Sequence, residues 1–213
     1  EPEGVENLQG QIVGEDAFFL VWTTTPWTLI SNVALAVGAD YDYVKVLHNG
    51  EKLILAESLL GILDGEYEVL EKTKGAALVG KRYEPCFPWF KNAENAFRVV
   101  AGDFVTLTDG TGIVHMAPAF GEDDYQTGRR EGLPFLQPVD SEGKFTAEVV
   151  KWAGRFIKQC DPEIIEDLKA RNILYKAQKI EHSYPFCWRC DTALIYYARK
   201  SWYIKTTAFK DLL

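Results

Sequence analysis

The chain has 213 residues, of which 47% are hydrophobic, and it carries a formal net charge of −8 at pH 7. This size and apolar content suffice for one substantial core, whereas every apolar run is shorter than the roughly 18 residues that a membrane-spanning helix needs. The negative charge excludes broad binding along a nucleic-acid backbone, which needs a face rich in lysine and arginine. It still allows a protein that grips one end of an RNA.

The first residues of the sequence do not resemble an export signal. Glu1-Pro2-Glu3-Gly4 lacks the basic and apolar regions of a signal peptide. Four cysteines, two of them spaced as Cys187-x-x-Cys190, suit a reducing compartment better than a disulfide scaffold, which would be denser in cysteine. We therefore expect a cytoplasmic protein with no membrane attachment.

The first predicted strand, residues 17–21 (AFFLV), leads into the sequence VWTTTPWT. Pro26 ends this strand because proline has no N–H to give to a neighbouring strand. The hydroxyls of Thr23–Thr25 therefore lie at a strand end, where they can hold a carbonyl, a ribose hydroxyl or a water. Threonine is a poor nucleophile without a nearby base, so the stretch by itself also fits a β-branched edge strand.

A turn over residues 29–32 and a series of short strands follow. Asn49-Gly50 is the pair that a type I′ hairpin prefers, and residues 75–90 predict a packed loop in which Cys86 is a buried small side chain. Apolar runs predict strands, antiparallel in the region from 43 to 70, at residues 33–37, 43–47, 53–56, 67–70, 97–100 and 104–107.

The second informative stretch is DGTGIVHMAPAFGEDDY at residues 109–125. It predicts a strand over 113–116 that carries His115, and a helix that begins after Gly121 with three acids in its first turn and ends at Gly132. Acids at that place are favoured by the helix dipole, and a strand histidine is commonly a hydrogen-bonded core residue. Each feature alone is thus explained without a function.

A later helix is predicted to have Asp161 as its N-cap and Pro162 at its first position. We interpret this helix as structural only, with one apolar face and an ion pair at i, i+4 on the other. The residues concerned are Ile164, Ile165 and Leu168 on the apolar face, and Asp167 with Arg171 in the ion pair.

Cys187-x-x-Cys190 supplies half of a tetrahedral zinc site, which needs two further Cys or His ligands. His182, Cys86 and Cys160 are the other candidates, and none has a persuasive spacing. We therefore expect an incomplete site whose other half is outside this sequence, and we assign no metal and no cofactor.

Three motifs together resemble one family. TTTPWT, then GTGIVHMAPAFGEDDY about ninety residues later, then HSYPFCWRC, are similar to the editing insertion (CP1) of isoleucyl-tRNA synthetase, a class I enzyme. Leucyl and valyl relatives typically have arginine at the position of Thr25 and an acid at that of Trp27, so the chain resembles the isoleucyl type. The resemblance implies an α+β fold, mainly an antiparallel β-barrel with peripheral helices, whereas the strands alone would equally suit a sandwich.

The resemblance also implies a function. Isoleucyl-tRNA synthetase is itself the standard example of a limit on selectivity, because one methylene in a hydrophobic pocket is worth only about 1–3 kcal/mol and valine is accepted as well. A second site then hydrolyses the wrong product. The expected substrates are valine esterified to the 3′ end of isoleucine tRNA, and valyl-adenylate.

Two roles carry over to the second stretch. Asp124 matches the acid that holds the α-ammonium of the misattached amino acid, in preference to its neighbour Asp123. His115 matches the residue that restricts the size of the pocket and rejects isoleucine.

The remaining roles carry over to the first stretch. Thr23, Thr24 and Thr25 match the strip that contacts the terminal adenosine and positions a water at the ester carbonyl, and Thr24 and Thr25 join Asp124 as the expected catalytic set. Asn32 is a weaker companion, and Trp27 is expected to pack beneath the site rather than to stack on a base. No nucleophile and base pair is evident, so the implied reaction is hydrolysis by a positioned water, assisted by a ribose hydroxyl.

The sequence is expected to divide into an editing domain, residues 1–181, and a return connector toward the rest of the synthetase, residues 182–213. It has neither a HIGH-like nor a KMSKS-like signature, so we do not expect it to activate an amino acid. Both ends look cut, the second inside an unfinished helix at Lys210-Asp211-Leu212-Leu213, which favours an excised domain. We also expect a monomer.

Three alternatives stay open: a non-catalytic module that binds an aminoacyl-tRNA end, a structural insert organised by a zinc knuckle, and a free-standing editing factor. The named residues are able to bind an ester without hydrolysing it, because only His115 is a strong general base by type. Turnover separates these classes, since a binding module protects the ester and an editing domain consumes it.

Overall fold

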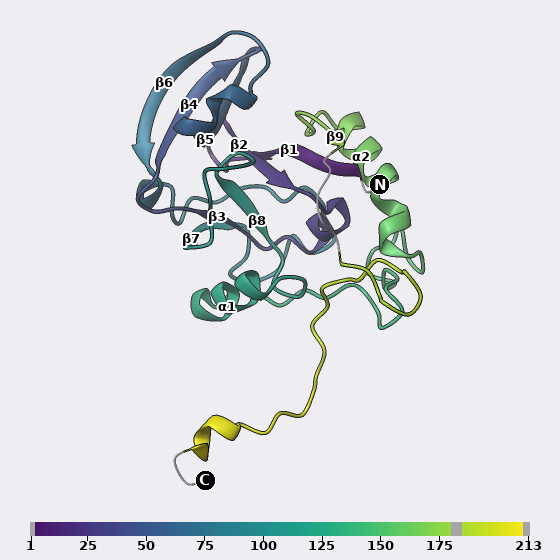
Figure 1. The fold of residues 1–213 in the computed structure, drawn as a ribbon. Helices are drawn as coiled ribbons and strands as arrows, with labels where there is room; N and C mark the ends of the chain where they lie inside the picture. Colours follow the sequence, from purple (N-terminus) through teal and green to yellow (C-terminus); the bar gives the residue numbers. More distant parts are fainter. Residues whose placement is uncertain (1–2, 180–184, 211–213) are drawn as a thin grey trace.

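The structure, a computed structural model, describes residues 3–179 and 185–210 (Figure 1). A curled, half-barrel β-sheet forms the body, and a few helices surround it. The strands are β1 Glu3–Gln11, β2 Phe18–Thr23, β3 Ala34–Val37, β4 Asp42–His48, β5 Glu51–Ala56, β6 Tyr67–Lys74, β7 Arg98–Ala101, β8 Ile113–Met116 and β9 Gln178–Lys179. The α-helices are α1 Glu122–Glu131 and α2 Ile157–Ala170, and the 3-10 helices are η1 Pro26–Ser31, η2 Glu57–Ile62, η3 Gly75–Ala77 and η4 Thr206–Ala208.

Seven strands follow one another in the order β6-β4-β5-β2-β8-β3-β7, while β1 pairs with β2 and with β9. Within the described ranges, β2 pairs in parallel with β5 and β8, β3 pairs in parallel with β7, and the other pairings are antiparallel. The predicted α+β class, a curved and mainly antiparallel sheet with peripheral helices, is confirmed. The parallel pairs are a feature that the prediction did not include.

Strand β2 lies in the middle of the sheet and is buried on both of its faces. Phe19 and Val21 belong to the principal core, which also contains Trp152, whereas Leu20 packs on the opposite side with side chains of β4 and β5. A strand covered on both faces needs apolar residues at successive positions, not at alternate ones. This explains the unbroken apolar run that precedes the threonines.

The β4–β5 hairpin has the predicted turn. Asn49 and Gly50 join the two strands with φ angles of 51° and 84°, and both central residues of a type I′ turn require such positive values. Strand β6 pairs with the other edge of β4, so the three strands form an arm at one end of the molecule (Figure 1).

The predicted strand over residues 104–107 is wrong. Strand β7 ends at Ala101, where its register reaches Val37, the last residue of β3. Gly102 then donates its N–H to the Val37 carbonyl, and Val105 turns back toward Gly102. The apolar residues that follow are therefore packed as a loop, because β3 offers no further backbone to pair with.

The predicted start of the second long helix is also wrong. Helix α2 begins at Ile157, with Phe156 as its N-cap, so Asp161 is not a cap and Pro162 lies inside the helix. Ile157 and Cys160 are fully buried and extend the apolar face of Ile164 and Leu168 toward the N-terminus. Burial of this longer face outweighs the local Asp-Pro start signal. The predicted ion pair between Asp167 and Arg171 is present at 2.8 Å.

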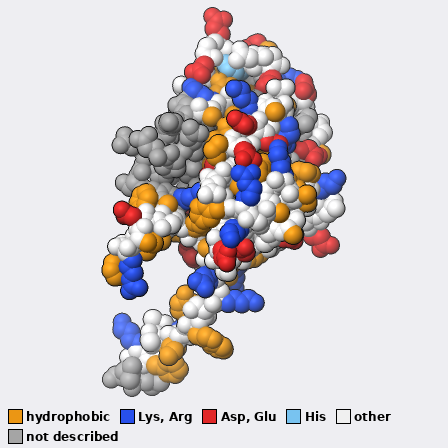
Figure 2. All heavy atoms as spheres, turned by 90° about the vertical axis from the view of Figure 1, so that its right-hand side faces the viewer, with side chains coloured by type: hydrophobic (Ala, Val, Ile, Leu, Met, Phe, Trp, Pro, Cys, Tyr) orange, Lys and Arg blue, Asp and Glu red, His pale blue; other side chains and the backbone are white. Residues whose placement is uncertain are grey.

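The C-terminal part of the described chain runs away from the body as an extended segment that ends near η4 (Figure 1). In the view of Figure 2, hydrophobic side chains are visible along this segment, while basic and acidic side chains alternate over the body. The predicted boundary at residues 181 and 182, His182, and residues 211–213 lie outside the described residues, so the division into two domains stays a prediction. None of the helices in the described ranges has the length and apolar content needed to cross a bilayer.

Candidate active site

Threonine residues form a hydrogen-bonded turn where β2 ends. The N–H of Thr25 donates to Thr23 Oγ1 at 3.1 Å, and Thr25 Oγ1 lies 2.9 Å from Thr28 Oγ1. Thr28 Oγ1 in turn donates to the Thr25 carbonyl at 2.7 Å. Pro26 opens η1 directly after this turn, a position where its missing N–H costs little. The predicted threonine strip is thus a compact turn between a buried strand and a short helix, with Thr24 half-buried within it.

His115 contacts this turn from the neighbouring strand. Strand β8 lies beside β2, and His115 Nε2 is 3.0 Å from Thr28 Oγ1. Burial lowers the pKa of His115 to about 4, so the ring is neutral at pH 7. Because the single hydroxyl hydrogen of Thr28 goes to the Thr25 carbonyl, His115 Nε2 carries the ring hydrogen and Nδ1 is a bare acceptor. In the described part of the chain, Nδ1 has no hydrogen-bond partner.

Asp124 lies in the first turn of α1 and is held by the turn that follows β8. Its Oδ2 accepts the N–H of Ala117, two residues beyond His115, at 2.8 Å. A side chain at Gly121 would bring a Cβ within 3.1 Å of the Asp124 carboxyl carbon, so glycine makes room for this contact. Burial raises the pKa of Asp124 and the charge of Asp123 adds to the rise, while the Ala117 N–H opposes it. Asp123 itself is exposed.

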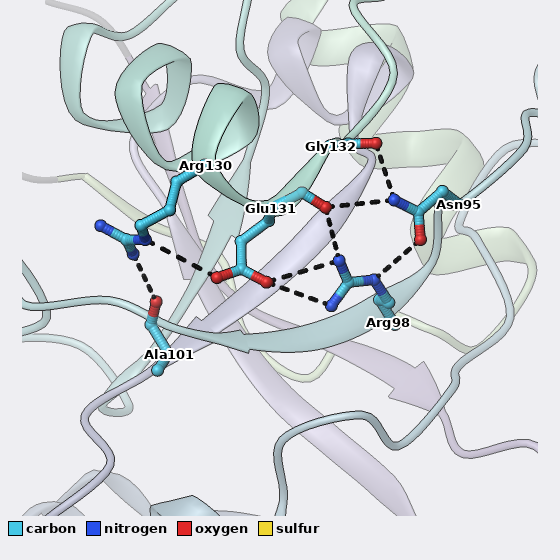
Figure 3. A network of polar contacts seen from close by, with 6 residues as sticks. All are labelled: Asn95, Arg98, Ala101, Arg130, Glu131 and Gly132. Carbon is cyan, nitrogen blue, oxygen red and sulfur yellow. Dashed lines mark hydrogen bonds and ion pairs between the residues drawn. The ribbon is translucent and has the colours of Figure 1, made fainter.

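The other end of α1 is fixed by a polar network (Figure 3). Arg98 on β7 donates to the Glu131 carbonyl at 2.8 Å and faces the Glu131 carboxylate at 3.4 Å. Asn95 donates to the carbonyls of Glu131 and Gly132 at 3.1 and 2.7 Å, which satisfies acceptors that a helix end leaves unpaired. Both ends of α1 are therefore attached to the sheet region, and with them the position of Asp124.

Trp27 and Asn32 lie behind the threonine turn. Trp27 is only 3% exposed, and its ring meets that of Phe120 edge-on at 4.8 Å, which places Trp27 beneath the site. Asn32 donates to the Ala34 carbonyl at 2.9 Å and accepts the hydroxyl of Tyr83. Both ends of the Asn32 amide are thus used to shape the loop between η1 and β3.

Two further residues complete the site and were not assigned to it from sequence. Thr28 links the threonine turn to His115, and the motif TTTPWT contained it without giving it a role. Asp161 of α2 accepts the N–H of Trp27 at 2.8 Å. Burial raises the pKa of Asp161 to about 7, although the Trp27 N–H and Lys158 oppose the rise. No local sequence pattern predicts a contact between residues that are 134 positions apart.

A groove of about 890 Å³ borders the turn that holds Asp124. It lies between α1 and the extended segment over residues 196–203, and aromatic and cationic side chains contribute to its walls. Arg129 lies over the ring of Tyr125 at 5.9 Å. Other lining residues include Phe120, Gly121, Tyr197 and Lys200.

The cysteine residues do not gather into a metal site in the described part of the chain. Residues 3–179 and 185–210 contain no cluster of three or more His, Cys, Asp or Glu side chains placed to hold a metal. Cys190 Sγ lies 3.2 Å from Thr192 Oγ1, a contact that lowers the pKa of this thiol. Cys86, predicted to be buried, is only partly buried, and burial of its thiol raises the pKa to about 11. The half zinc site at Cys187 and Cys190 stays a prediction.

Comparison with known proteins gives close sequence relatives. No protein-family model matches the chain. The isoleucine–tRNA ligase of Clostridium acetobutylicum is 55% identical over 199 residues, which are 93% of this chain and 19% of that protein. The isoleucine–tRNA ligase of Clostridium kluyveri is 55% identical over 203 residues, with 95% and 20% covered. The chain thus spans about a fifth of the length of the curated relatives it matches.

Solved structures show the same fold at low sequence identity. The crystal structure of GlLeuRS-CP1 has a TM-score of 0.64 and 13% identity, and the match covers 82% of this chain and 99% of that one. The editing domain of the P. falciparum cytosolic leucyl-tRNA synthetase has a TM-score of 0.56 and 12% identity, with 78% and 81% covered. The chain therefore belongs to the isoleucine–tRNA ligase family and is the segment of it that has the fold of the CP1 editing domain.

Proposed function

We propose that this chain is the editing site of an isoleucine–tRNA ligase, where valine misattached to isoleucine tRNA, and valyl-adenylate, are hydrolysed. The observation that carries the proposal is the meeting of two distant stretches, residues 23–28 and 115–124, at one place, in a chain with these relatives. The threonine turn touches His115 through Thr28, and the turn after β8 holds Asp124. A buried strand supports the first stretch, and an anchored helix supports the last.

Asp124 binds the α-ammonium group of the substrate in this proposal. One of its oxygens is fixed by the Ala117 N–H, so the carboxylate has a defined direction and the second oxygen remains for the ligand. A hydrogen bond between an ammonium and a carboxylate is charge-assisted and stronger than a neutral one. Substrate binding also counteracts the raised pKa of Asp124, because a nearby positive charge favours the ionised form.

His115 acts as the limit on side-chain size. Its ring is neutral, 8% exposed and hydrogen-bonded to Thr28, so it forms a fixed wall rather than a mobile charged group. Valine fits against such a wall, and the extra methylene of isoleucine meets it. With a pKa of about 4, His115 is too weak a base at pH 7 to deprotonate the attacking water efficiently.

Hydrolysis then depends on orientation and electrostatics. The hydroxyls of Thr24 and Thr25 hold a water near the ester carbonyl, and the water oxygen attacks the carbonyl carbon. The bond from that carbon to the ribose oxygen breaks, the ribose oxygen takes a proton, and valine leaves as its carboxylate with the second proton released to solvent. A neighbouring ribose hydroxyl of the tRNA assists the proton transfer. Positioning of the reacting groups and electrostatic stabilisation supply most of the rate enhancement.

The proposed partners are the 3′ end of the tRNA and the remainder of the ligase, in the cytoplasm, with this segment as a monomer. The chain has net charge −8, and a phosphodiester backbone is bound through basic side chains. We therefore expect weak tRNA affinity from this segment alone, with other parts of a full-length ligase neutralising the phosphates.

The test is hydrolysis of valyl-tRNA and isoleucyl-tRNA by this chain at high protein concentration and low salt. Selective release of valine is the expected result. Protection of both esters would overturn the catalytic proposal in favour of a binding module, and equal release of both would overturn the specificity. Small aminoacyl-adenosine esters serve as a second substrate, because they require no contact with the body of the tRNA.

A further inference from the structure

Helix η1 begins without the cap that its own sequence offers. Thr25 occupies the N-cap position, where a threonine hydroxyl normally accepts an N–H from the first turn. Thr25 makes no such side-chain bond. The N–H of Thr28 bonds to the Thr25 carbonyl instead, and Pro26 has no N–H to satisfy. The remaining donor of the first turn is the N–H of Trp27.

Asp161 satisfies that donor from another element. Its Oδ1 accepts the Trp27 N–H at 2.8 Å, across 134 residues of sequence, and α2 packs directly against η1. Either protonation state of a carboxyl group offers an acceptor oxygen, so the bond does not require Asp161 to be charged. The carboxyl is partly buried between the two helices, with Lys158 and Cys160 of α2 as its ionisable neighbours.

The Thr25 hydroxyl is consequently used for other contacts. Because Thr28 gives its hydroxyl hydrogen to the Thr25 carbonyl, Thr25 Oγ1 donates to Thr28 Oγ1 at 2.9 Å. Its acceptor side receives no backbone N–H from the helix it precedes. Thr23 Oγ1 lies 3.5 Å away, so the two hydroxyls are side by side at the turn.

We propose that Asp161 is a positioning residue that caps η1 in place of Thr25 and so leaves the Thr25 hydroxyl to hold the attacking water. This inference rests on the proposed function of the threonine turn. Without Asp161, the orphaned Trp27 N–H draws the Thr25 side chain into the ordinary capping rotamer. Thr25 Oγ1 then turns away from Thr28 and from the ester.

The first experiment compares Asp161→Ala, Asp161→Asn and, as a matched acid-to-alanine control on the same helix, Glu166→Ala. We expect Asp161→Ala to lower kcat for valyl-ester hydrolysis by about tenfold with little change in KM, in line with the loss of one cap and one positioned hydroxyl. Asp161→Asn retains an acceptor oxygen and is expected to keep near-normal kcat, as is Glu166→Ala. Equal losses in Asp161→Ala and Asp161→Asn, or no loss in either, would overturn the capping role.

The second experiment needs no catalysis and separates failure of this inference from failure of the proposed function. Amide hydrogen exchange at Trp27 and the side-chain coupling constants of Thr25 are measured by NMR in the same variants. Asp161→Ala is expected to accelerate exchange at the Trp27 amide by about fivefold to tenfold and to change the Thr25 rotamer. Asp161→Asn is expected to preserve both. An unchanged Thr25 rotamer in Asp161→Ala would overturn the inference even if the variant loses activity.

Discussion

The region around η1 and the extended C-terminal segment are both rich in aromatic and hydroxyl residues, yet they have opposite environments. Trp27 of η1 is 3% exposed and Trp152, which contacts α2, is fully buried, while Trp202 in the segment is 101% exposed. Hydrogen bonds from β8 and α2 reach η1, so the Thr28 hydroxyl and the Trp27 N–H each have a defined partner. Composition therefore does not distinguish the organised part of this chain from the extended segment. The organised part is distinguished by contacts between residues that are distant in sequence.

A matched pair of tryptophan substitutions measures this difference most directly. Trp152→Ala is expected to lower the free energy of unfolding by about 3–5 kcal/mol, because it opens a cavity in the principal core. Trp152 also donates its indole N–H to Glu163 at 3.2 Å, so that bond is lost as well. Trp202→Ala is expected to stay within about 0.5 kcal/mol of the parent chain. Urea unfolding measures the free energy of unfolding of both variants. Similar losses of stability would contradict the difference between the buried and the exposed region.

Asp124→Asn probes the organised region for charge rather than for packing. The amide oxygen of asparagine still accepts the Ala117 N–H, so the fold is expected to persist. The ammonium of the substrate loses a charged partner worth about 1.5–3 kcal/mol, which corresponds to a fall in kcat/KM of about 10-fold to 150-fold. Valyl-ester hydrolysis is measured beside Asp123→Asn, an exposed neighbour of identical chemistry. If both variants lose activity equally, Asp124 is not the specific anchor.

His115→Ala tests the size limit, with His48→Ala as a second buried histidine remote from the threonine turn. Removing the ring at His115 is expected to let isoleucyl-tRNA enter and be hydrolysed at least about tenfold faster. One methylene group in a pocket changes discrimination by a factor of this order. Valyl-tRNA hydrolysis should continue in both variants. The role fails if His115→Ala still rejects isoleucine, or if His48→Ala relaxes specificity to the same extent.

Local signals predicted the elements that local forces decide. The Asn49-Gly50 turn and the glycine that ends α1 depend on the backbone freedom of a few residues, and both are present. The strand over 104–107 failed because pairing depends on how far β3 extends. Asp161 was misassigned because burial of Ile157 sets the start of α2.

The residues of the candidate site also fall into two groups, those predicted from local motifs and those identified only by long-range contacts. The threonine turn, His115 and Asp124 were found through motifs, and the structure brings their segments together. Thr28 and Asp161 were missed, because their roles consist of contacts to residues 87 and 134 positions away. Only the packing of η1 against β8 and α2 creates these contacts, and single-sequence patterns carry no record of it.

The last prediction concerns the pH dependence of stability and isolates Asp161. Its pKa is about 7 in the folded chain against an ordinary value of 3.8, so between these limits the folded state binds a proton that the unfolded state has released. The wild-type chain therefore loses stability relative to Asp161→Asn as pH rises from about 4 to 7, by at most about 1.4 kcal/mol per pH unit. Above about pH 7 the difference levels off, since both states are then ionised.

His115 contributes a slope of the opposite sign, because its folded pKa of about 4 lies below the ordinary 6.5 and acid favours the unfolded state. That contribution is common to the wild-type chain and Asp161→Asn, so it cancels when the two urea-unfolding free energies are subtracted at each pH. A difference that falls with rising pH supports a partly buried, protonatable carboxyl against η1. Parallel curves would mean that Asp161 ionises as it does in water, and the contact with the Trp27 N–H would then belong to an ordinary surface carboxylate.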